Sequence, residues 1–207
     1  MKIEIRSAGE IRVSGYVNAV ERDSKILPAE MSRGAPGPFV EKVRAGAFKR
    51  AIDRNPNVRL LFNHEREIGS VGAGSLTLRE DNIGLHAEAV ITDAEVIAAA
   101  KKGELRGWSF GFSGAVDNWE QYKDGVQRRT LTDFQLSEVS ILTRTPAYVG
   151  TSVELRGEDC LTREVRSCED TAELTEIPEN KTGKSPADNG LFLMQKQLEI
   201  LKLKGEV

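Results

Sequence analysis

The sequence predicts a β-rich α+β fold in which mainly antiparallel strands form a sheet or a barrel with flanking helices. The first observation is that apolar and polar residues alternate in several runs before residue 143, which is typical of half-buried strands. The second is turn chemistry between these runs, as in residues 81–84 (DNIG). The third is the capping-box pattern of residues 92–95 (TDAE), which predicts a helix start among the strands.

Seven runs of the chain are expected to be strands. They span 11–20, 58–62, 75–80, 85–91, 107–116, 126–132 and 134–143. Residues 81–84 are expected to close a hairpin, and residues 123–125 (KDG) a second tight turn. The helix that begins at 92–95 is expected to end at Gly103, because glycine adopts the left-handed conformation of a helix end at little steric cost.

The end of the chain differs in composition from the first 155 residues. Of all the aromatic residues only Phe192 lies beyond residue 155, so the tail is not expected to form a comparable core. We expect a folded domain over 1–155, a flexible acidic linker over 156–190 and a short amphipathic helix over 191–207. The apolar stripe of that helix is Leu191, Met194, Leu198 and Leu201. A lone helix of this length is marginal in water, so the stripe is expected to dock on the domain or on a partner.

Charge and composition exclude several classes of function. The formal net charge of −3 gives no general attraction to nucleic acids or anionic membranes, and neither is expected as a partner. Two cysteines and two histidines cannot assemble a Cys/His zinc cluster, so no metal and no other cofactor is expected. The first residues alternate charged and apolar side chains, and no long apolar segment follows, which predicts a cytosolic chain.

The two histidines, His64 and His86, limit where acid–base chemistry can occur. His64 directly follows the apolar run 58–62, at a polar strand end of the kind that often displays active-site residues. His86 lies inside the run 85–91, where an exposed position on a strand is the simpler interpretation. His64 is therefore the candidate general base.

Ser109 is a candidate nucleophile in an unusual strand. Alternation in the run 107–116 places Trp108, Phe110 and Phe112 on one face, and Ser109 among small residues on the other. Small residues can leave room for an extended substrate beside the hydroxyl, or they can simply permit close backbone packing in a core strand. Spacing alone leaves both interpretations open.

Glu138 lies on a partly apolar face of the run 134–143, together with Ser140. A carboxylate there needs a partner, and the third member of a serine–histidine–acid triad is one such role. An ion pair with Arg144 would also satisfy it, and Arg144 could instead help to bind an oxyanion.

Short motifs spread over residues 10–155 are weak individually but specific in their order and spacing. They are Gly15-Tyr16, Phe39-Val40-Glu41, Gly46-Ala47-Phe48, Leu61-Phe62-Asn63-His64, Gly69, residues 81–85, residues 105–112 (LRGWSFGF), residues 136–143 (LSEVSILT) and Pro146-Ala147-Tyr148. Together they resemble the prohead proteases of tailed bacteriophages. Those enzymes are serine proteases related in fold to the herpesvirus capsid protease, assemblin.

The resemblance implies that His64 is the general base, Ser109 the nucleophile and Glu138 the third catalytic member. In assemblin the third member is a histidine at a similar separation after the serine, which favours Glu138 by position. Ser140 lies two residues further along the same predicted face and is the rival nucleophile.

The resemblance also implies a biological role. Such enzymes cut the scaffolding segment of the capsid protein, and often themselves, inside the immature phage head in the bacterial cytoplasm. Assemblin-like proteases are activated by dimerisation, so a homodimer or larger homo-oligomer is expected. The alternatives are a catalytically idle capsid-assembly or scaffold module of the same fold, and an esterase or amidase that uses the same residues on small substrates.

Overall fold

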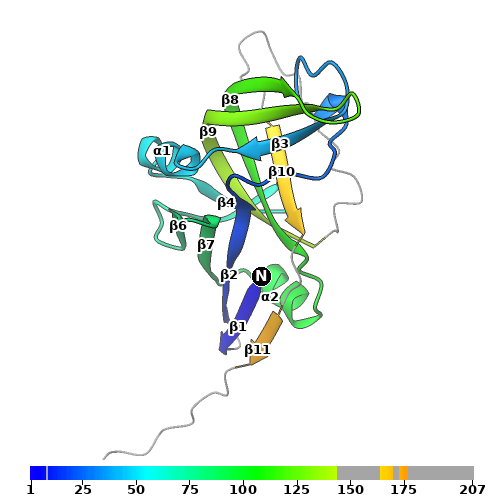
Figure 1. Cartoon of the computed structure of the whole chain (residues 1–207). Helices are drawn as coiled ribbons and strands as arrows, with labels where there is room; N and C mark the ends of the chain where they lie inside the picture. Colours follow the sequence, from blue (N-terminus) through cyan, green and yellow to red (C-terminus); the bar gives the residue numbers. More distant parts are fainter. Residues whose placement is uncertain (8, 144–163, 170–172, 177–207) are drawn as a thin grey trace, which may run out of the picture. The chain divides into compact units, whose positions relative to one another are not determined.

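Two β-sheets share one hydrophobic core in the computed structural model, which describes residues 1–7, 9–143, 164–169 and 173–176 (Figure 1). In chain order the elements are β1 (Lys2–Ser7), β2 (Glu10–Ala19), the 3-10 turn η1 (Ala29–Met31), β3 (Phe39–Val43), α1 (Ala47–Arg54), β4 (Arg59–Phe62), β5 (Arg66–Ser70), β6 (Leu76–Glu80), β7 (Gly84–Ile91), α2 (Ala94–Lys101), β8 (Gly107–Gln121), β9 (Gln127–Leu142), β10 (Glu164–Glu169) and β11 (Glu173–Glu176). The β-rich α+β class is confirmed. Most strand pairs are antiparallel, and neither sheet closes into a barrel within the described ranges.

The first sheet has the strand order β11-β1-β2-β7-β6. Its β6–β7 hairpin closes at residues 81–84, as the sequence predicts. The Asp81 carboxylate accepts hydrogen bonds from the amides of Ile83 (2.9 Å) and Gly84 (3.2 Å), which fixes the turn.

The second sheet has the order β10-β8-β9-β4-β5, and β3 pairs with β9 as well. Its centre is the β8–β9 hairpin, which turns at residues 123–125 as expected. The sequence predicts separate strands over 126–132 and 134–143, but both belong to the single 16-residue strand β9. This length lets β9 pair in parallel with β3 near its start and with β4 near its end.

A β-bulge in the hairpin changes which side chains share a face. Gly111 pairs with Glu138 whereas Phe112 pairs with Leu136, so Ser137 is the extra residue. Strict alternation would place Leu136 beside Glu138, but the bulge turns Leu136 into the core. Glu138 is thereby left on the opposite face from the apolar cluster.

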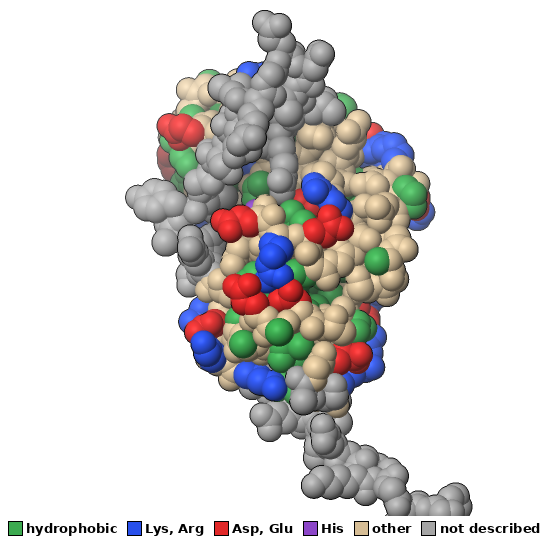
Figure 2. All heavy atoms as spheres, turned by 180° about the vertical axis from the view of Figure 1, so that it is seen from behind, with side chains coloured by type: hydrophobic (Ala, Val, Ile, Leu, Met, Phe, Trp, Pro, Cys, Tyr) green, Lys and Arg blue, Asp and Glu red, His purple; other side chains and the backbone are tan. Residues whose placement is uncertain are grey.

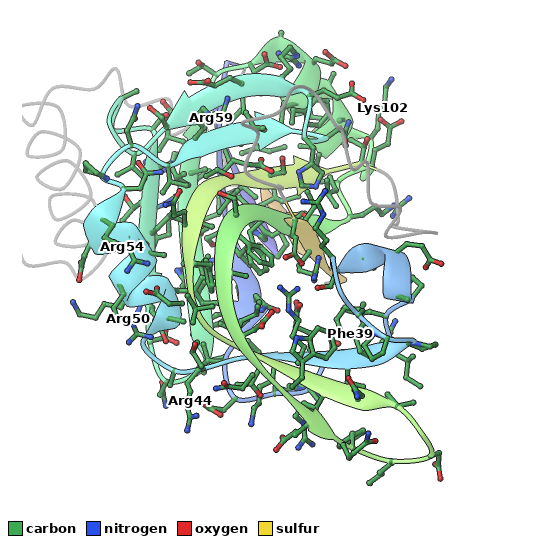
Figure 3. All side chains as sticks on the ribbon, turned by 90° about the horizontal axis from the view of Figure 1, so that it is seen from above. Phe39, Arg44, Arg50, Arg54, Arg59 and Lys102 are labelled. Carbon is green, nitrogen blue, oxygen red and sulfur yellow. The ribbon has the colours of Figure 1, made fainter. Side chains whose placement is uncertain are left out.

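The core is built largely from aromatic and β-branched side chains of both sheets. Phe48, on α1, packs edge-on against Phe110 and Phe134, with ring centroids 5.2 Å apart in each pair. A smaller cluster lies under the β8–β9 hairpin, where Phe39 packs against Trp119. Figure 3 shows Phe39 on β3 beside the β8–β9 ribbon.

Helix α2 is confirmed, but its N-cap is Asp93 and not Thr92. The Asp93 carboxylate accepts hydrogen bonds from the amides of Glu95 (3.1 Å) and Val96 (3.0 Å). It also binds the Arg66 guanidinium, and this contact together with the two amides holds the pKa of Asp93 below its usual range. The helix ends before Gly103, which has a φ of +67° as predicted.

Replacing Asp93 with alanine is expected to lower the free energy of unfolding by about 1 kcal/mol, the usual cost of losing an N-cap. Asp93→Asn keeps the cap but loses the charge, so a smaller loss is expected. Because the folded state lowers the Asp93 pKa, its ionic contribution is present above the ordinary value of 3.8 and is lost as the pH falls through the folded pKa. Denaturant titrations at neutral and acidic pH measure both effects, and equal losses for the two variants would contradict the cap.

The part of the chain expected to be a linker, residues 156–190, contains two strands. β10 pairs antiparallel with β8, and β11 pairs in parallel with β1 (Figure 1). The remainder of that range and the amphipathic stretch 191–207 lie outside the described residues, so both expectations stay predictions.

Basic and acidic side chains lie next to one another on the molecular face of Figure 2, with no large area of one sign, as the small net charge suggests. Among the described helices, none is long and apolar enough to span a bilayer.

Candidate functional site

The backbone at the end of β4 turns sharply and positions His64. Asn63 and His64 have φ angles of +53° and +63°, in the left-handed region that residues other than glycine rarely adopt. The strand β9 holds this conformation: the Asn63 amide donates to the carbonyl of Ile141 (2.9 Å), and the Asn63 side-chain oxygen accepts from the amide of Thr143 (2.9 Å). Strained backbone of this kind persists where neighbouring contacts fix it, and it is frequent at functional sites.

The His64 side chain contacts Glu138. The distance from Nδ1 to Oε1 is 2.8 Å, and the Glu138 side chain is completely buried while that of His64 is 23% exposed. An ionised carboxylate can only accept a hydrogen bond, so Nδ1 carries the proton and Nε2 keeps its lone pair. This is the tautomer that a general base requires.

Nε2 of His64 is itself shielded from solvent, and among the described residues it has no hydrogen-bond partner. A buried nitrogen lone pair without a donor is costly in a folded protein. It is therefore a site where a hydroxyl proton or a bound substrate could be accommodated.

Ser140 links His64 to Glu138. Its hydroxyl donates to Glu138 Oε2 (3.0 Å) and accepts from the backbone amide of His64 (3.1 Å), and Ser140 is completely buried. Both carboxylate oxygens of Glu138 are thus occupied, one by the imidazole and one by this serine. Ser140 fixes the acid and the backbone of the histidine at the same time.

Ser109 lies on β8 directly opposite Ser140 on β9. Side chains of directly opposed residues share a face, with Cβ atoms about 5 Å apart, so Ser109 and His64 are both immediate neighbours of Ser140. Ser109 is fully buried, and its hydroxyl donates to the carbonyl oxygen of Arg166 on β10 (2.7 Å). The sheet therefore brings Ser109, Ser140, Glu138 and His64 into one cluster.

Residues 107–111 (GWSFG) have the Gly-x-Ser-x-Gly spacing of the nucleophile elbow of α/β-hydrolases. That elbow is a sharp turn from strand to helix. Here the five residues lie inside the continuous strand β8, so Ser109 is displayed by a strand and not by an elbow.

Several residues of the site gave little or no sequence signal. Alternation placed Ser140 on the face of Glu138. The hydrogen bond from the Thr143 amide to the Asn63 side chain, in contrast, joins two segments that are far apart in the chain. Arg166 reaches Ser109 across 57 positions and had no local signal. Arg144 lies outside the described residues, so its role as an oxyanion ligand or as a partner of Glu138 stays a prediction.

The described residues contain no group of histidine, cysteine, aspartate and glutamate side chains that could hold a metal ion. A hydroxyl, a buried carboxylate and an imidazole whose Nε2 has no partner in the described part of the chain belong to one cluster, and such a set of groups can support covalent catalysis by a serine.

Comparison with known protein families identifies a family for this chain. A family model described as caudovirus prohead serine protease matches residues 1–165, which include all four residues of the cluster. Comparisons with curated proteins and with solved structures give no match. The relation to assemblin therefore stays a prediction from the sequence.

Proposed function

Because the chain belongs to the caudovirus prohead serine protease family, we propose that it is a serine endopeptidase with Ser109 as nucleophile, His64 as general base and Glu138 as third catalytic member. The observation that carries the proposal is the 2.8 Å contact of His64 Nδ1 with the buried Glu138, which leaves Nε2 directed away from the acid.

The reaction follows the chemistry of a serine triad. Nε2 of His64 takes the Ser109 proton as Oγ attacks the peptide carbonyl, and Glu138 stabilises the imidazolium that forms. The imidazolium then protonates the leaving amine, and the acyl-enzyme on Ser109 is hydrolysed by water. Arg144 and backbone amides are the proposed ligands of the oxyanion.

In this proposal Ser109 is the nucleophile and Ser140 a positioning residue. Neither serine donates to His64 Nε2 in this structure. The Ser140 hydroxyl donates to Glu138 Oε2 and accepts from the His64 amide, so it holds the acid and the backbone of the histidine. The Ser109 hydroxyl instead donates to a peptide carbonyl, that of Arg166, which is the kind of group that a substrate presents to a nucleophile.

The proposed substrate is the scaffolding segment of the cognate capsid protein, which the enzyme would remove inside the immature head, in the bacterial cytoplasm. Cleavage of the chain itself and assembly into a homodimer or larger homo-oligomer belong to the same proposal. Neither a nucleic acid nor a membrane is a proposed partner.

Co-expression with the cognate capsid protein, followed by intact-mass measurement, tests this function. Wild type is expected to shorten the capsid protein, and Ser109→Ala is expected to leave it at full length. A full-length capsid protein with wild type would instead favour a catalytically idle assembly module of the same fold.

Ser140→Ala is expected to retain cleavage at a rate lowered about tenfold to hundredfold, because a buried amide and a carboxylate oxygen each lose a hydrogen bond. The loss should appear in kcat, since the substrate is not contacted. Initial rates on a capsid-derived peptide measure it. Complete loss of activity in Ser140→Ala, with activity kept in Ser109→Ala, would transfer the nucleophile to β9.

A further inference from the structure

Strand β10 lies along the edge of β8 where the proposed nucleophile is found. Its six residues pair antiparallel with residues 107–112 of β8 (Figure 1). The hydroxyl of Ser109 donates to the carbonyl oxygen of Arg166, at 2.7 Å. Since a C=O bond is about 1.23 Å long, the carbonyl carbon of Arg166 lies within about 4 Å of Ser109 Oγ. An extended peptide that adds to a sheet edge is a common mode of peptide recognition.

The Arg166 side chain is buried in a site formed by Glu41 of β3. Its guanidinium donates to both carboxylate oxygens of Glu41, at 2.6 and 2.8 Å, and to the carbonyl of Met31 at 3.2 Å. The guanidinium also lies 5.3 Å from the ring centroid of Phe112. Only 6% of Arg166 is exposed, so Arg166 and Glu41 form a bidentate ion pair that is shielded from water.

The charges around Glu41 fit a cationic side chain. Arg129 binds Glu41 and Asp117 as well as Glu164, and both Glu164 and Arg166 belong to β10. β10 brings one anion, Glu164, and one cation, Arg166, so the cluster carries one net negative charge with or without the strand. The preference for a cation therefore rests on Glu41 itself. Its buried carboxylate is bound through both oxygens by Arg166, and a substrate with a neutral residue there would leave it without this partner.

We propose that β10 occupies the substrate site of its own chain, that the Arg166–Ser167 peptide bond is the self-processing bond, and that Glu41 selects arginine or lysine before the cut bond in substrates. This inference rests on the proposed function and names the substrate class of the same site. The Ser109 hydroxyl donates to the carbonyl oxygen of Arg166, so its proton has not yet been passed to His64. The structure therefore corresponds to the bound strand before the peptide bond is attacked.

Cleavage of this bond balances without any co-reactant other than water. Ser109 Oγ forms a bond to the Arg166 carbonyl carbon while its proton passes to His64 Nε2. The bond from that carbon to the Ser167 nitrogen then breaks, and the nitrogen takes the proton from His64. Water hydrolyses the ester, which leaves a carboxylate on Arg166 and restores the Ser109 hydroxyl.

The first test is the intact mass of the purified full chain during incubation. Wild type is expected to yield a fragment of residues 1–166, and Ser109→Ala is expected to remain whole. Glu41→Gln is expected to slow the appearance of this fragment at least tenfold, whereas Glu65→Gln, the same change at an exposed carboxylate, is expected to have no effect. A Ser109-dependent cut at another bond, or an unchanged rate in Glu41→Gln, would overturn the inference.

The second test needs no variant of the enzyme, so it holds even if Glu41→Gln does not fold. Wild type is given a synthetic peptide of residues 161–172, or the same peptide with glutamine at 166 or at 163. We expect cleavage after Arg166, a loss of at least tenfold in kcat/KM for Arg166→Gln, and little change for Arg163→Gln, which removes the same charge. Equal losses for the two peptides would overturn the selection of a cation by this site.

The two proposals fail in different ways. If neither the capsid protein nor any peptide is cut in a Ser109-dependent manner, the protease function itself is wrong. If the capsid protein is cut while the chain and its peptide stay intact at Arg166, the protease function stands and the inference on β10 is wrong.

Discussion

Replacing Ser109 with alanine is expected to lower kcat/KM for a capsid-derived peptide by about 10⁴-fold to 10⁶-fold, because the covalent path then has no nucleophile. Ser109 is buried beside Ser140 and donates to a peptide carbonyl, so alanine removes little more than this hydroxyl. The fold is expected to remain, with a loss in the free energy of unfolding of about 1 kcal/mol for the hydrogen bond. Initial rates measure the change in kcat/KM, and denaturant titrations measure the change in the free energy of unfolding.

Ser113→Ala is the matched control, since Ser113 lies on the same strand and pairs with Gln135, away from Glu138 and Ser140. Its activity is expected to stay within about twofold of wild type, as is usual away from the chemistry. Activity within tenfold of wild type in Ser109→Ala would contradict the assignment.

Glu138→Gln is expected to lower kcat by about 10³-fold to 10⁴-fold, in line with the loss of the third member in other serine triads. The carboxylate accepts from His64 Nδ1 through one oxygen and from the Ser140 hydroxyl through the other. A glutamine has one acceptor oxygen, so it cannot satisfy both donors. Either the His64 Nδ1–H loses its acceptor, so that the ring is no longer held in one orientation, or the Ser140 hydroxyl loses its acceptor.

The same substitution is expected to lower the free energy of unfolding by about 1 to 3 kcal/mol, since a buried group is left without a partner. Glu65→Gln, next to His64 but exposed, changes the charge equally and is expected to alter neither quantity. A Glu138→Gln enzyme with near-normal kcat would remove Glu138 from the triad, whatever its stability.

Much of the fold could be predicted from local patterns. Alternation predicted the strands at the centre of both sheets, and the residues 81–84 and 123–125 predicted their turns, because these signals are contained within a few residues. The cap of α2 was predicted one residue too early, since Thr92 and Asp93 are both good N-caps and the Arg66 contact that favours Asp93 is distant in sequence. Helix α1 was not predicted, because its N-cap residue is Gly46, which has no side chain, and the carboxylate that accepts from the amides of Gly46 and Lys49 belongs to the distant Glu80.

The candidate cluster follows from the sequence only in part. His64 was a candidate because of its place at the end of an apolar run, and Glu138 because of its place on a partly apolar strand face, and their catalytic roles stay predictions. The role of Ser140 requires the parallel pairing of β4 with β9, which no local pattern reveals. The bulge at Ser137 and the left-handed backbone of Asn63 and His64 likewise arise from tertiary contacts.

The most direct test of the triad is to map the residue modified by a fluorophosphonate while the enzyme is cutting the capsid protein. The reagent forms a bond from phosphorus to an activated serine oxygen and releases fluoride, and a shift in intact mass followed by peptide mapping locates it. The account predicts modification of Ser109 in wild type and in Ser140→Ala, and none in His64→Ala. Modification of Ser140, or capsid cleavage that continues without modification of Ser109, would contradict it.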